Sequence, residues 1–76
     1  MEKNLYFKKL NYDSSMIKSS KFNSRTNDLE VTFKNDIAYK FKDVSDEDYE
    51  SFSNADSAGK GFNQYIKKYN GTPATN

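Results

Sequence analysis

The 76-residue sequence contains no cysteine and no histidine. Without cysteine the chain has no disulfide and no thiolate, and without histidine it has no imidazole ligand and no side chain that ordinarily titrates between about pH 5 and 8. These absences exclude the commonest catalytic and zinc-binding arrangements. We therefore expect a protein that is not an enzyme and that carries no metal and no cofactor.

Long apolar runs are missing as well. No segment approaches the roughly 20 residues that a membrane-spanning helix needs, and the N-terminus lacks the pattern of a secretory signal. The composition, rich in Lys, Asn, Ser, Tyr and Phe, is typical of AT-rich genomes of bacteria and phages. We expect a protein of the bacterial or phage-infected cytoplasm that does not enter a membrane.

Hydrophobic residues make up only 34% of the chain, but six are Phe and six are Tyr. A chain of this length forms one domain, and each buried aromatic ring contributes about 150–250 Å² of contact area, so we expect one aromatic core. The predicted domain covers residues 14–70. Residues 1–13 form an N-terminal arm or an extra strand, and residues 71–76 form a flexible tail.

The clearest local pattern is a β-hairpin, in which apolar residues alternate with polar ones on both sides of Asn35. A three-residue loop, residues 34–36, keeps the apolar residues on one face and requires Asp36 to adopt a left-handed conformation. The predicted cross-strand pairs are Leu29 with Phe41, Val31 with Tyr39, Phe33 with Ile37, Glu30 with Lys40 and Asp28 with Lys42. The apolar members of these pairs are predicted to face the core.

A further strand is expected over residues 16–22. Ile17 and Phe22 are an odd number of residues apart, so they can share a face only across a bulge, and Ser20 is expected at that bulge or at a sheet edge.

Two helices are predicted to follow the hairpin. Ser45 is the expected N-cap of the first, which begins at Asp46, and Asp56 or Ser57 is the expected cap of the second. Gly71 is the predicted C-cap of the second helix. The apolar residues predicted to contact the sheet are Tyr49, Phe52, Phe62, Tyr65, Ile66 and Tyr69. The predicted fold is therefore α+β, a small antiparallel meander of three or four strands followed by two short helices packed on one face.

Residues of both predicted layers together resemble the KTSC domain. They are Ser14-Ser15-x-Ile17, Phe22, Leu29-x-Val31-x-Phe33, Tyr39 and Phe52-x-x-Ala55-x-Ser57-x-Gly59-x-x-Phe62-x-x-x-Ile66-x-x-Tyr69. This family is named from the C-termini of some lysyl-tRNA synthetases and also occurs as short stand-alone bacterial and phage proteins. The resemblance implies the same fold and brings no established catalytic residues.

Small residues at the start of the second helix, Ala55, Ser57 and Gly59, have two interpretations. They could bind an anion through exposed backbone N–H groups, or they could cap the helix and permit close packing. We favour the structural interpretation.

The uneven distribution of charge suggests two binding functions. Six acidic and no basic residues fall between positions 43 and 56. The preferred hypothesis is an accessory module that docks on a partner protein or on a second copy of itself. The candidate residues are Asp46, Glu47, Glu50, Tyr6 and Phe7. The alternative is a DNA- or RNA-binding module that uses the basic face of the sheet. Its candidate residues are Lys18, Lys21, Arg25, Lys34, Lys40 and Lys42.

Overall fold

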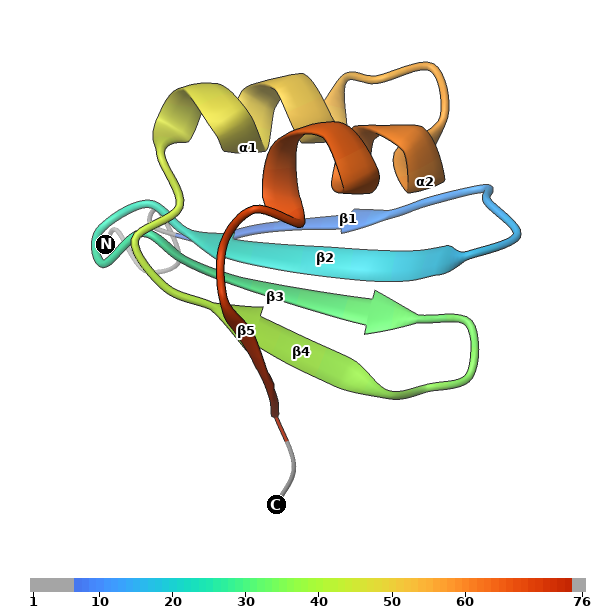
Figure 1. Cartoon of the computed structure of the whole chain (residues 1–76), viewed down its shortest axis with the longest axis horizontal. Helices are drawn as coiled ribbons and strands as arrows, with labels where there is room; N and C mark the ends of the chain where they lie inside the picture. Colours follow the sequence, from blue (N-terminus) through green and yellow to red (C-terminus); the bar gives the residue numbers. More distant parts are fainter. Residues whose placement is uncertain (1–6, 75–76) are drawn as a thin grey trace, which may run out of the picture.

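The computed structural model describes residues 7–74, with side chains from Leu10 onward. A five-stranded antiparallel sheet is covered on one face by a short helical layer (Figure 1). The strands are ordered β1-β2-β3-β4-β5, each beside its neighbour in sequence. The elements are β1 Phe7–Asn11, β2 Ile17–Asn23, β3 Asp28–Phe33, β4 Ala38–Phe41, α1 Asp46–Ser53, α2 Ala58–Gly61, the single π-helical turn η1 Phe62–Ile66, and β5 Gly71–Pro73.

The β3–β4 hairpin has the register that the alternating pattern predicts. Leu29 is opposite Phe41, Glu30 opposite Lys40 and Val31 opposite Tyr39. Asp36 has a φ of 69°, as the three-residue loop requires. The ladder ends at Phe41, so the predicted pairing of Asp28 with Lys42 is not part of it.

Ile37 is a correction to the predicted core. It lies opposite Phe33, whose N–H donates to the Ile37 carbonyl, but 46% of Ile37 is exposed. The alternation of residues identifies the face of the sheet correctly. It does not say how far along that face the helical layer extends, and Ile37 is left largely uncovered.

The bulge predicted in β2 is present. The pairing of β2 with β3 shifts between Ile17 and Ser19, and both Ile17 and Phe22 are consequently buried. Ser20 is 1% exposed and shares a 2.8 Å hydrogen bond with the hydroxyl of Tyr12. Burial raises the pKa of Tyr12, against the lowering effect of its hydrogen bond to Ser20, and burial also raises the pKa of Tyr49 to about 12. A small polar cluster is thus enclosed in an aromatic core.

Two further strands bring the count above the predicted three or four. Residues 7–11, within the segment expected as an arm or extra strand, form β1. At the other end, Gly71 is not a helix C-cap, and residues 71–73 are not a tail, because they form β5 beside β4. Gly71 has no positive φ, and a side chain there would collide with the Phe41 ring. Glycine is therefore required here for close approach rather than for a left-handed turn.

The helix starts are as predicted. The Ser45 hydroxyl accepts from the Asp48 N–H at 3.0 Å, and the Ser57 hydroxyl accepts from the Lys60 N–H at 3.3 Å. The second helix is short, with four residues in α2 before the chain widens into η1. Two glycines in α2 give it a weak intrinsic helix propensity, so its stability depends on packing. No helix within residues 7–74 is long and apolar enough to span a membrane.

The helical layer packs closely at Gly61. A Cβ at this position would come within 2.8 Å of the Ala55 Cβ and 3.0 Å of the Phe52 carbonyl oxygen. At Gly59 the nearest atom is the Met16 sulfur, at 3.4 Å, on a flexible side chain. The small residues in this segment therefore have the structural role predicted, but the tight contact is at Gly61 rather than at Gly59.

This difference predicts opposite outcomes for two matched substitutions. Gly61→Ala should lower the free energy of unfolding by about 1–3 kcal/mol, because backbone and a short side chain must move to admit the methyl group. Gly59→Ala should be neutral or should stabilise by up to about 1 kcal/mol through helix propensity. Urea unfolding of both variants checks this, and equal stabilities would contradict the assigned contact.

Candidate functional site

The basic residues proposed for nucleic-acid binding do not form one patch. Lys21 and Lys40 lie on the uncovered face of the sheet, but Glu30 is between them and paired in register with both. Asp28 lines the same shallow hollow as these three residues. Two basic and two acidic side chains therefore share this surface, so it carries no local positive charge.

The remaining basic candidates are dispersed. Lys18 forms an ion pair with Asp36 at the tip of the hairpin. Arg25 lies in the β2–β3 turn, Lys34 in the β3–β4 turn, and Lys42 beyond the end of β4. Affinity for a phosphate backbone comes from several cations acting together, and of the six candidates Lys18 is paired with Asp36 while Lys21 and Lys40 share their surface with two acidic residues.

The acidic candidates do lie together at the start of α1. Asp46, Glu47 and Glu50 line one shallow surface, and Asp46 accepts a 3.1 Å hydrogen bond from the Asn27 side chain. Their charges favour the positive end of the helix dipole, which explains them without a ligand. Within residues 7–74 no group of acidic side chains is arranged to hold a metal ion. Tyr6 lies outside the described residues, and Phe7 belongs to β1 but its side chain is not described.

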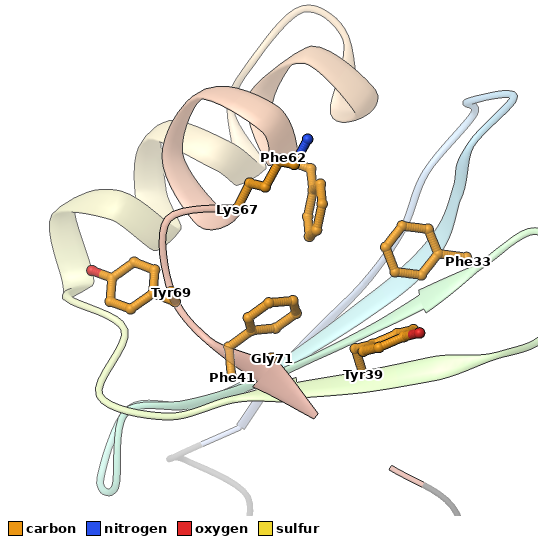
Figure 2. Close-up of a pocket in the computed structure, with 7 residues that line it drawn as sticks. All are labelled: Phe33, Tyr39, Phe41, Phe62, Lys67, Tyr69 and Gly71. Carbon is orange, nitrogen blue, oxygen red and sulfur yellow. The ribbon is translucent and has the colours of Figure 1, made fainter. Parts of the chain in front are cut away.

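A groove that sequence reasoning missed lies between the sheet and the helical layer (Figure 2). The Phe62 ring points from the helical segment toward the rings of Phe33, Tyr39 and Phe41 on the sheet, whereas the Lys67 side chain runs along the helical segment with its nitrogen directed away from those rings. The groove has a volume of about 250 Å³. Its lining residues are Phe33, Tyr39, Phe41, Phe62, Lys67, Tyr69 and Gly71.

Contacts between the rings fix the groove walls. Phe33 meets Tyr39 edge-on, with centroids 5.9 Å apart, and meets Phe62 edge-on at 5.3 Å. Phe41 also packs edge-on against Phe62, at 5.7 Å. Such geometries match the positive edge of one ring to the negative face of another. The groove is therefore bounded by rings that hold one another in place.

Tyr69 is anchored through its hydroxyl. This hydroxyl donates to the Asp48 carboxylate at 2.6 Å and accepts from the Ser45 N–H at 3.1 Å, so a groove residue is tied to the start of α1. Lys68 pairs with the same carboxylate at 3.0 Å. The hydrogen bonds from Tyr69 and then Lys68 lower the pKa of Asp48, and Asp48 raises the pKa of Lys68.

Every aromatic residue of the groove was assigned to the core at the level of sequence. The assignment is correct for Phe41 and Phe62, which are buried, but Phe33, Tyr39 and Tyr69 are only partly buried. The sequence held one signal of a groove. The apolar face of the hairpin is long and the predicted helices are short, so the helices cannot cover all of that face. Chemically, the groove offers mainly aromatic surface, with Lys67 on its helical wall, and such a surface suits binding.

The fold and the groove define a small α+β domain in which an antiparallel meander carries a partial helical layer. A family model for the KTSC domain matches residues 13–69, and the chain belongs to the KTSC domain family. The chain is also similar in structure to a KTSC domain protein from Yersinia pestis, with a TM-score of 0.83 and 24% identity, covering 91% of this chain and 99% of that one. No curated protein matches the sequence.

The Tyr69–Asp48 hydrogen bond predicts a pH-dependent effect of Tyr69→Phe. Asp48 has a lowered pKa in the folded state, so its contribution is present above the unfolded pKa of about 3.9 and is lost as pH falls through the folded pKa. The wild type should exceed Tyr69→Phe in stability at neutral pH, and the difference should shrink below about pH 4. Urea midpoints at several pH values measure it.

Tyr65→Phe is the matched control, because Tyr65 lies in η1 and makes no hydrogen bond through its hydroxyl within the described residues. Its difference from the wild type should be small at every pH. If the Tyr69→Phe difference stays constant into acid, the Asp48 carboxylate is not the partner that matters.

Proposed function

We propose that this KTSC domain is a non-catalytic protein-binding module and that a partner docks in the aromatic groove. The observation that carries this proposal is the groove itself, where three partly buried aromatic rings remain accessible beside two buried ones. Aromatic residues are enriched where proteins bind one another, since each supplies a large contact area at little cost in conformational entropy.

The size of the groove supports a protein side chain as the occupant. Small-molecule sites usually enclose about 300–1,000 Å³ and bury most of their ligand. A groove of about 250 Å³ lies at the lower end of such sites, and one bulky side chain of a partner fits within it. Burying such a side chain is worth about 1.5–3 kcal/mol, so other contacts must add to the affinity.

The lining residues support binding over catalysis. General acid–base and nucleophilic catalysis require paired titratable groups within hydrogen-bond reach. The groove is lined by phenylalanines, tyrosines, a glycine and Lys67, with no carboxylate among them. The alternative of nucleic-acid binding lacks comparable support, because the outer face of the sheet mixes both charges.

Selection from a displayed library of random linear peptides tests the proposal. Peptides enriched on the wild type should contain a bulky apolar residue, and Tyr39→Thr should weaken their binding by about tenfold, as expected for losing one well-packed aromatic contact. Threonine is β-branched and suits a strand, so the substitution should leave β4 in place. Fluorescence anisotropy with labelled peptides gives the affinities.

Lys40→Thr is the matched control, because Lys40 is the next residue of β4 and lies on the opposite face of the sheet. It should bind the selected peptides as the wild type does. Amide NMR shifts of the wild type during titration should cluster around the groove. Shifts confined to another surface, or equal loss of affinity in both variants, would refute the groove as the docking site.

A further inference from the structure

The charged residue beside the groove indicates which kind of side chain could bind there. Lys67 is the only charged residue that lines it, and it is exposed. Within residues 7–74 Lys67 makes no ion pair. The adjacent Lys68 is already engaged, since it pairs with Asp48 and lies 5.7 Å from the Tyr69 ring centroid. The nitrogen of Lys67 points away from the rings (Figure 2), so Lys67 is the cation available to the part of an occupant that extends beyond them.

This arrangement disfavours a cationic ligand. Aromatic rings can bind ammonium groups through their electron-rich faces, so five rings alone would suit a lysine or arginine of a partner. The groove contains no carboxylate to complement such a charge, and Lys67 repels it. The combination fits a side chain that is apolar, next to a group that is negative.

The apolar surface extends beyond the groove along β4. Ile37, 46% exposed, is two residues before Tyr39 and therefore on the same face of the strand. Phe33 lies opposite Ile37 and lines the groove. The accessible surface is thus elongated, from the hairpin tip to Tyr69. An extended peptide segment matches this shape better than a compact small molecule does.

We infer that the occupant of the groove is an extended, acidic segment of a partner protein, with a bulky apolar side chain between the rings and an adjacent carboxylate paired with Lys67. This inference rests on the proposed function, which concerns only the place of docking. The contact between Lys67 and a carboxylate supplies selectivity for sequence, whereas the rings supply most of the buried area.

Reversing the charge of Lys67 tests the inference. The wild-type protein should select peptides in which Asp or Glu adjoins a bulky apolar residue, and Lys67→Glu should select Lys or Arg there instead. Lys60→Glu makes the same change in net charge on α2, away from the groove lining, and should select the wild-type motif. Melting curves of all three proteins check that they are folded.

A double-mutant cycle with one selected peptide measures the pair directly. Replacing the peptide's acidic residue by its amide should weaken binding to the wild type by about three- to fivefold, as expected for an exposed ion pair, and should leave binding to Lys67→Gln nearly unchanged. The wild-type affinity should also fall with added salt, because an exposed ion pair is screened.

The outcomes separate the inference from the proposal beneath it. Suppose that peptides bind, that their affinity depends on Tyr39, and that the same apolar motif is selected on the wild type and on Lys67→Glu. The inference of an acidic occupant is then wrong, and the groove remains the docking site. If no peptide is enriched, or if binding ignores Tyr39→Thr, both are wrong. Concentration-dependent dimerisation abolished by Tyr39→Thr, without peptide binding, would identify a second copy as the occupant and overturn the inference.

Discussion

Phe62 packs its ring edge-on against Phe33 of β3 and Phe41 of β4. This contact joins the helical layer to the part of the sheet that lies toward β5. Phe62 begins η1 directly after Gly61, whose lack of a side chain lets the segment lie against Phe52 and Ala55. The close approach at Gly61 therefore sets where Phe62 meets the sheet. From there the chain continues to β5, so both the groove and the fifth strand depend on this one position.

Much of the fold could be predicted because the relevant interactions are local. The hairpin register follows from alternation and loop length, and the helix starts follow from hydroxyl groups that cap free N–H groups. The β2 bulge followed from the odd spacing of Ile17 and Phe22. In each case the physical cause lies within a few residues of its effect.

The missed features depend on contacts between distant residues. Residues 71–73 have no hydrophobic alternation, and Gly and Pro ordinarily indicate the end of a helix, so β5 arises only because the folded chain passes the free edge of β4. The groove was missed for a related reason. Periodicity identifies which face of a strand is apolar, but the exposure of Ile37 and Tyr39 depends on how far a four-residue helix and one π-helical turn extend over that face.

The groove also persists as an open feature for identifiable reasons. Phe41 is held between Phe62 and the backbone at Gly71, and Tyr69 is anchored to Asp48 and Ser45 through its hydroxyl, so neither ring is free to fill the space. Rings fixed before binding lose little conformational entropy when an occupant arrives. In the proposed docking, the packing that stabilises the core would also preorganise the groove, so a domain this small would need only a few contacts to recognise a partner.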